Sequence, residues 1–271
     1  MRAVAAAALL ALAWPSAAEA ADYGGGGAGA RVTLLTVRTR ADGTATVRAV
    51  IQARCGVARA GRPVTPAAEG SFAFTATART RTGERGVRQI ARVTVAGRLV
   101  GSTASGTATA RISFRGGGRV VERCASGRRP WQARAAAAET VAGAPRPNGA
   151  YQGLTSQTAA RPRALVLRVD ATGRRVTAAA FQYRDVCESR AFEKENLTPG
   201  AAIAADGSFR LRERFTLRFA DATERFRVRV DGRFTPAGVN GTLSVTSVAR
   251  SPGGAVFDRC ATGRLTFAGA L

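Results

Sequence analysis

The chain contains no histidine, and Lys194 is the only lysine among its 41 basic residues. Without an imidazole, a serine–histidine or cysteine–histidine nucleophile pair cannot be built, and a zinc site lacks its usual parts. A serine–lysine dyad could use only Lys194, which lies among acidic residues. Phosphate-binding loops of the G-x-x-x-x-G-K type are also missing. These absences exclude the best-known nucleophilic, zinc-dependent and nucleotide-dependent enzymes.

Long apolar runs are absent as well. The run at residues 3–14 is too short for the ~20 residues that cross a bilayer core, and no later segment approaches that length. Arg2 precedes this run, and Pro15 and the small-residue pattern Ala18-Glu19-Ala20 follow it. The sequence therefore predicts a signal peptide at residues 1–20, cleaved after Ala20, and a secreted or cell-envelope-associated protein without a transmembrane segment.

Several short fragments occur twice. Arg-Cys-Ala-Ser-Gly-Arg begins at Arg123 and Arg-Cys-Ala-Thr-Gly-Arg begins at Arg259, and Glu-Gly-Ser-Phe and Asp-Gly-Ser-Phe form a second such pair. This spacing is far above that of solenoid repeats, so it predicts two domains. The expected divisions are a flexible leader at 21–30, a first β-domain at 31–134, a linker at 135–148 and a second β-domain at 149–271. The alanines of the linker could instead form one or two helical turns.

The four cysteines permit three pairings, and no C-x-x-C spacing occurs. Because a duplicated domain carries its own disulfide, the repeat predicts that Cys55 pairs with Cys124 and that Cys187 pairs with Cys260. In an exported protein such bonds persist. Each would stabilise its domain by ~4 kcal/mol in the chain-entropy model.

Apolar residues alternate with arginines over residues 209–219 and 225–230, with Asp221-Ala222-Thr223 between the two runs. This period of two predicts a hairpin with one buried face. Further strands are expected at residues 32–38, 45–53, 72–78, 87–95, 107–114, 164–169, 176–183, 239–248 and 264–268, with a short one at Trp131. The predicted fold is all-β, with two tandem antiparallel meander domains, each a small barrel or a sandwich with one disulfide.

A resemblance rests on motifs of the second copy: Tyr151-Gln152-Gly153-Leu154-Thr155-Ser156-Gln157, then Cys187, Asp206-Gly207-Ser208-Phe209, the segment 232–242 and Cys260-Ala261-Thr262-Gly263. In these the chain resembles the uncharacterised secreted β-domains common in actinobacteria, here as a tandem pair. The first copy departs from the pattern at its start, where a glycine run follows Tyr23. The resemblance implies a fold class and a compartment, and it implies no activity.

Three residues interrupt the strand patterns. Gly97 and Gly232 lie inside predicted strands, where glycine marks bulges or sharp bends. Glu213 is in phase with the apolar side chains of its strand and would point inward if that strand were regular. A bulge or a strand end open to solvent is the expected explanation, and an inward carboxylate with a perturbed pKa is the alternative.

Acid/base catalysis needs paired carboxylates at the mouth of a pocket. Glu122 and Asp258 are equivalent in the two copies but belong to different domains, and we expect each to offset a neighbouring arginine. Glu188, Glu193 and Glu195 lack the dense oxygen ligands of a calcium loop, so we expect them in a solvated loop. The sequence therefore predicts no catalytic residue, no metal site and no cofactor.

The net charge of +23 predicts attraction to anionic polymers. The predicted hairpin would present a ladder of arginines on one face, where like charges repel unless an anion intervenes. A bound polyanion would make charge-assisted contacts with them, whereas the alternative is a solvated face with mobile counterions. The candidate contact residues are Arg210, Arg212, Arg214, Arg218, Arg225, Arg227 and Arg229.

These observations favour an exported, non-enzymatic binding or structural module with affinity for anionic envelope polymers or polysaccharide. Specific nucleic-acid binding is not expected, because aromatic residues are missing from the arginine phase. One alternative is a protein that binds a small molecule inside a β-barrel. The other is a hydrolase that works through carboxylates.

Overall fold

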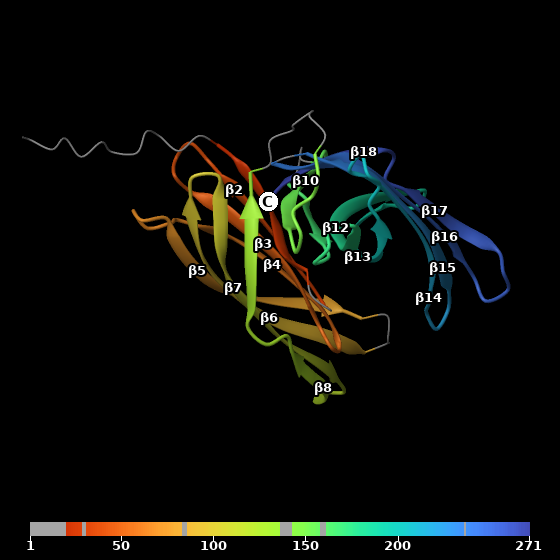
Figure 1. Ribbon diagram of the computed structural model, residues 1–271. Helices are drawn as coiled ribbons and strands as arrows, with labels where there is room; N and C mark the ends of the chain where they lie inside the picture. The colour runs from red at the N-terminus through yellow and green to blue at the C-terminus, as the bar shows by residue number, and fades with distance from the viewer. Residues whose placement is uncertain (1–19, 29–30, 83–85, 136–142, 158–160, 236) are drawn as a thin grey trace, which may run out of the picture.

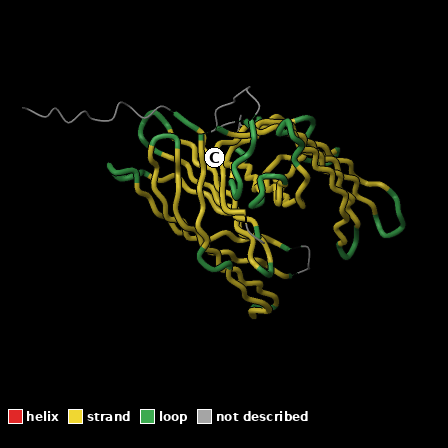
Figure 2. The backbone as a smooth tube through the Cα atoms, in the orientation of Figure 1, coloured by secondary structure: helices red, strands yellow, loops and turns green. Residues whose placement is uncertain are grey.

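The computed structural model describes residues 20–28, 31–82, 86–135, 143–157, 161–235 and 237–271. Within these residues the regular elements are all β-strands, which confirms the all-β class (Figure 2). The same residues contain no helix long and apolar enough to cross a membrane. The expected signal peptide lies outside the described residues apart from Ala20, and the middle of the expected linker, residues 136–142, lies outside them too.

The first nine strands form one antiparallel sheet in the order β4-β3-β2-β1-β9-β7-β6-β5, and β8 pairs with β7 beside this path. The strands are β1 (Asp22–Ala28), β2 (Val32–Thr39), β3 (Ala45–Ala53), β4 (Gly56–Val64), β5 (Ser71–Arg81), β6 (Val87–Val100), β7 (Thr103–Gly116), β8 (Arg119–Ala125) and β9 (Arg129–Arg134).

The second sheet has the order β13-β12-β11-β10-β18-β16-β15-β14, and β17 pairs with both β12 and β16. Its strands are β10 (Ala150–Thr155), β11 (Ala164–Val169), β12 (Arg175–Cys187), β13 (Ala191–Ala202), β14 (Ser208–Arg218), β15 (Thr223–Phe234), β16 (Gly238–Arg250), β17 (Val256–Ala261) and β18 (Leu265–Ala270). Each position in this order is occupied by the strand nine places later in the chain than its counterpart in the first sheet. Figure 1 shows the two curled sheets side by side.

Both sheets are barrel-like, and they close differently. In the second sheet the pairing of β17 with β12 completes a ring of strands, and the Cys187–Cys260 disulfide joins two residues that face each other in that pairing. In the first sheet β8 pairs with β7 alone, and the Cys55–Cys124 disulfide ties β8 to the turn between β3 and β4. Both predicted disulfides are therefore confirmed, and the first one spans the gap that hydrogen bonds leave open.

Alternating side chains fill the interior of each sheet, as the period of two predicts. The largest fully buried side chains of the first interior include Trp131, Leu35 and Ile51. Phe181 and Tyr183 are among those of the second interior. Both interiors are thus packed mainly with apolar groups.

A third apolar cluster joins the two sheets. Val32, Leu34 and Val50 of the first sheet pack there with Val166 and Ala164 of the second. This contact explains why β2 and β11 are apolar on both faces, because each strand is buried on the inside of its own sheet and also between sheets. The expected division into two domains joined by a linker stays a prediction.

The expected flexible leader at residues 21–30 is wrong for Asp22–Ala28, which form β1 between β2 and β9. The glycine run allows β1 to lie against the second sheet. A Cβ at Gly24 would lie 2.1 Å from the Gly153 oxygen of β10. The Gly26 amide also donates a buried hydrogen bond of 2.8 Å to Gln152 Oε1 of the same strand. Because these glycines carry no side chain, β1 can pack closely against β10.

Of the bulges or sharp bends expected at Gly97 and Gly232, the bulges are wrong, because both residues lie in unshifted register. Their role is to make room for aromatic rings. A Cβ at Gly97 would lie 2.5 Å from the Trp131 ring, and a Cβ at Gly232 would lie 2.5 Å from the Phe209 ring.

Candidate functional site

The predicted arginine hairpin is formed by β14 and β15, and its register aligns the arginines in rows across the outer face. Arg214 faces Arg227, and Arg225 of the next row faces Thr216. The arginines of these rows are exposed, whereas Phe226 and Val228 between them are buried. The rows continue over β16 to β17, where Val248 faces Arg259. Four neighbouring strands therefore present guanidinium groups to solvent.

A groove of about 510 Å³ lies on this outer face. Its basic lining residues are Arg214, Arg225, Arg227, Arg250 and Arg259. Among the residues that the structure describes, none of these arginines forms an ion pair with a carboxylate. We name this feature the second-sheet groove.

The other predicted contact residues lie outside this groove. Arg212 forms an ion pair of 2.8 Å with Asp231, and Arg210 lies 3.9 Å from the same carboxylate. Arg229 faces Arg212 across the hairpin, and Arg218 lies near its turn. Asp231 thus offsets one end of the arginine face, whereas the arginines at the groove end form no ion pair within the described part of the chain.

Sequence reasoning missed Arg250 and Arg259 as part of this surface. Arg259 belongs to the repeated Arg-Cys-Ala fragment; the disulfide ties its strand, β17, to β12, and backbone pairing places β17 beside β16. The repeat itself was the available signal for this residue. Arg250 follows an irregularity in the pairing of β16 with β17, so its position could not be obtained from alternation alone.

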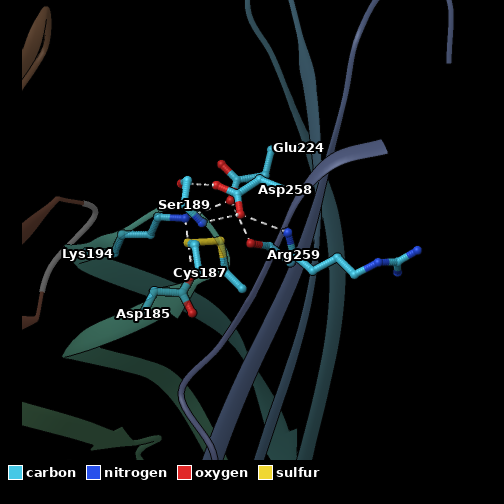
Figure 3. The surroundings of a disulfide bond; sticks show 9 residues. Asp185, Cys187, Ser189, Lys194, Glu224, Asp258 and Arg259 are labelled. Carbon is cyan, nitrogen blue, oxygen red and sulfur yellow. Dashed lines mark hydrogen bonds and ion pairs between the residues drawn. A yellow bond between two sulfur atoms is a disulfide. The ribbon is translucent and has the colours of Figure 1, made fainter. Parts of the chain in front are cut away.

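The inner side of the second sheet carries a polar cluster beside the disulfide (Figure 3). Lys194 Nζ lies 3.2 Å from Asp185 Oδ2 and 2.7 Å from Glu224 Oε1. Ser247 Oγ donates to the same Glu224 oxygen over 2.6 Å. The Lys194 ammonium also lies 4.8 Å from the centroid of the Phe226 ring. Three strands, β12, β13 and β15, supply the charged groups of this cluster.

Asp185 is fully buried, and its second oxygen has no hydrogen-bond partner among the described residues. Burial raises the pKa of Asp185, and the Lys194 ammonium partly offsets this effect. Burial also raises the pKa of Tyr183. A carboxylate oxygen of Asp185 lies within 4.8 Å of both sulfurs of the Cys187–Cys260 pair. These sulfurs are joined in the disulfide and offer no thiolate ligands for a metal ion.

Two acidic predictions need correction here. Glu193 and Glu195 lie in β13, where they form ion pairs with Arg163 and Arg59, so they are not in a solvated loop. Asp258 does not offset the guanidinium of Arg259. Its carboxylate is buried and accepts hydrogen bonds from Ser189 and from the Arg259 amide, and the Ser189 bond is the main reason that its pKa is lowered.

Glu213 also differs from the expected explanation. It faces Val228 in unshifted register in the interior of β14, so neither a bulge nor a strand end accounts for it. Its Oε2 atom is buried without a partner among the described residues, and burial raises its pKa. Glu213 therefore matches the alternative expectation, an inward carboxylate with a perturbed pKa.

A cleft of about 600 Å³ opens where β13 and the β14–β15 hairpin face β3 and β4 of the first sheet. Phe215, Leu217 and Phe219 contribute to one wall, and Leu217 and Phe219 are 44% and 53% exposed. The opposite wall contains Val50 and Val57, and Lys194 and Glu224 also line the cleft. This cleft therefore has apolar side chains on both walls, and its lining also includes the charged cluster, the Arg59–Glu195 ion pair and the amides of Gln52 and Asn196.

The second-sheet groove can hold oxyanions, and the cleft can hold an apolar group. Both carboxylates beside Lys194 form ion pairs with its ammonium. Comparisons with protein-family models, with curated proteins and with solved structures found no match to this chain. The resemblance to secreted actinobacterial β-domains stays a prediction.

Proposed function

We propose that this protein is an exported, non-enzymatic module that binds anionic polymers through the second-sheet groove. The observation that carries this proposal is the groove itself, in which five arginines from four strands lie without acidic partners among the described residues. Polymers of the cell envelope or acidic polysaccharides are the ligand class that we assign.

The electrostatics of the groove support this assignment. Guanidinium groups bind phosphate, sulfate and carboxylate groups through paired, charge-assisted hydrogen bonds. Arginines that face one another across strands repel, and a bound polyanion removes that repulsion. The net charge of +23 attracts such a polymer from a distance.

The two aromatic residues that line the groove, Phe215 and Phe226, argue against single-stranded nucleic acid as the specific ligand. Phe226 is buried beneath the arginine face, and its ring stacks on that of Phe215 with centroids 4.7 Å apart. Stacking of bases on exposed rings is a main source of affinity for single strands. In this proposal the groove recognises the negative charges that repeat along the polymer.

The compartment that we propose is the cell envelope or the extracellular space. Two disulfides support it, because such bonds form and persist in oxidising surroundings. The signal-peptide pattern at residues 1–20 leads to the same proposal.

The test measures binding to a heparin fragment and to inorganic polyphosphate over a series of salt concentrations. Replacing Arg225, Arg227 and Arg259 together by Ser removes three guanidinium groups from the groove. For nucleic acids each phosphate contact adds about 0.7–0.9 to the slope of log affinity against log salt, so we expect that slope to fall by about 2. Thermal stability should hardly change, because exposed charges contribute little to folding.

The control variant replaces Arg174, Arg175 and Arg184 by Ser; these exposed arginines lie in β12 and in the turn before it, outside the groove. It changes the net charge by the same amount. If the groove and control variants lose affinity equally, binding reflects net charge and the proposal fails.

The cleft favours a second candidate function, the binding of a small apolar molecule. Exposed Leu217 and Phe219 leave apolar surface uncovered beside a cleft of about 600 Å³, a volume typical of ligand sites. A neutral solvatochromic dye such as Nile red should bind with increased fluorescence. The double change Leu217→Ser and Phe219→Ser should abolish that increase, and an unchanged signal excludes the cleft.

A further inference from the structure

The first sheet carries a groove on the strands that correspond to those of the second-sheet groove. Its volume is about 500 Å³, and it lies on β6, β7 and β8. Arg92, Arg111 and Arg123 line it together with apolar groups that include Ile90. We name it the first-sheet groove.

The strand registers show that the two grooves occupy the same place. In the first sheet Arg92 faces Arg111, and Ser113 of the next row faces Arg123. In the second sheet Arg227 faces Thr246, and Val248 of the next row faces Arg259. Both grooves therefore cover the same two rows of corresponding strands.

The two pairs of rows carry equal numbers of arginines at different positions. Arg79 of β5 faces Ile90, and Thr77 faces Arg92, so the first-sheet rows hold Arg79, Arg92, Arg111 and Arg123. The second-sheet rows hold Arg214, Arg225, Arg227 and Arg259. An arginine occupies the same position in both sheets at two places only: Arg92 corresponds to Arg227, and Arg123 corresponds to Arg259. Four arginines in the two rows are thus the shared property, although half of their positions differ and most of the exposed lining of the first-sheet groove is apolar.

Arg123 and Arg259 explain part of the sequence repeat in chemical terms. Each directly precedes a disulfide cysteine, and each lies on the exposed face of its strand. The disulfide anchors the strand, and the exposed arginine beside it lines a groove. The Arg-Cys pair of the repeated fragment therefore joins a structural residue to a binding residue.

The charges of the first-sheet groove are also uncompensated. Among the residues that the structure describes, Arg79, Arg92, Arg111 and Arg123 form no ion pair. The nearby acid Glu122 lies beside Arg123 in β8, but successive strand residues point to opposite faces. Anion binding would relieve the repulsion between Arg92 and Arg111, as we propose for the second sheet.

We infer that the chain holds two separate anionic-polymer sites, one in each groove, so that one molecule binds two short anionic oligomers. This inference rests on the proposed function of the second-sheet groove. The ligand chemistry at both sites is a linear chain of oxyanions. A long polymer that reaches both grooves would gain avidity, because the second contact becomes intramolecular.

The test titrates the full chain at low salt with a short heparin oligosaccharide and, separately, with a short polyphosphate. Isothermal titration calorimetry should give a stoichiometry of two oligomers for each wild-type chain. The first-sheet variant, Arg92→Ser with Arg111→Ser and Arg123→Ser, should bind one. The second-sheet variant with Arg225, Arg227 and Arg259 changed to Ser should also bind one, and the combined variant should bind none. Circular dichroism and thermal unfolding verify that each variant is folded.

The outcomes separate the two proposals. Suppose that the wild-type chain binds one oligomer and that the first-sheet variant binds as the wild type does. The first-sheet groove is then not a binding site, although the proposed function of the second-sheet groove stands. If the wild-type chain binds neither oligomer, the proposed function itself fails. Binding of only one oligomer type identifies the source of the oxyanions as polysaccharide or as phosphate. The control variant with Arg174, Arg175 and Arg184 changed to Ser should keep both sites, and loss of a site there would overturn the assignment to grooves.

Discussion

Replacing Lys194 by Met should destabilise the second sheet. Met keeps an unbranched side chain of similar length but removes the ammonium that lies 3.2 Å from Asp185 and 2.7 Å from Glu224. The Asp185 side chain is 0% exposed, and Lys194 is its only cationic partner among the described residues. The change therefore leaves a buried carboxylate without compensation, whereas Glu224 keeps its bond from Ser247.

The magnitude follows from the burial of the pair. Removing one partner of a buried ion pair costs about 3–5 kcal/mol. Lys194 is 21% exposed toward the cleft, so water can replace part of its interaction and we expect about 3 kcal/mol. The corresponding decrease in Tm is roughly 10 °C.

The pH dependence distinguishes this mechanism from lost packing. Burial raises the pKa of Asp185, so the folded state binds more protons than the unfolded state between the two pKa values. Stability therefore falls as the pH rises through that range. Lys194 lowers this pKa, so its removal raises the pKa further and extends the range upward. The free energy of unfolding that Lys194→Met loses relative to the wild type should be largest near pH ~8 and should decrease toward pH ~5.

Urea denaturation at both pH values measures the free energy of unfolding. The double variant Lys194→Met with Asp185→Asn should recover most of the loss at the higher pH, because no buried charge remains. A deficit below about 1 kcal/mol at that pH, or one that is equal at both pH values, refutes the reasoning.

Three further changes test other parts of the fold. Gly24→Ala should destabilise the protein by about 1–3 kcal/mol because its Cβ would overlap the backbone of β10, whereas Gly116→Ala, whose Cβ would make an ordinary contact of 3.4 Å, should cost much less in thermal unfolding. Glu213→Leu should stabilise the protein near neutral pH, because Glu213 Oε2 is buried without a partner among the described residues and burial raises the pKa of this carboxyl; unchanged stability in urea denaturation contradicts that. Changing Cys55 and Cys124 to Ser should speed hydrogen exchange in β8 more than the equivalent change does in β17, because β8 pairs with one strand only; equal exchange contradicts this explanation.

Strands with strict alternation were predictable from local sequence. The runs around Phe209 and Phe226, for example, lie within β14 and β15. Their apolar and charged side chains reveal which face is buried without any knowledge of the neighbours. The disulfide pairing was predictable from the repeat for a similar reason, because each pair lies within one copy.

Several strands carry no such pattern. β1 is mostly glycine, and β4 contains glycine and proline, which are weak strand formers. β13 carries Glu193, Lys194 and Glu195 in succession, which is typical of a solvated loop. These segments become strands because neighbouring strands offer hydrogen bonds and because their charges find partners across the sheet. Sequence patterns contain neither kind of information.

The sequence by itself determined the all-β class and both disulfides, because alternation and the positions of the cysteines in the repeat are properties of the chain read in order. Only the tertiary structure decided which charges meet. Lys194 lies between Asp185 and Glu224 because three separate strands converge there, and Arg259 joins Arg225 and Arg227 because β17 pairs with β16 in one register. Such contacts depend on pairing between segments far apart in the chain, and a shift of one residue would turn each side chain to the other face.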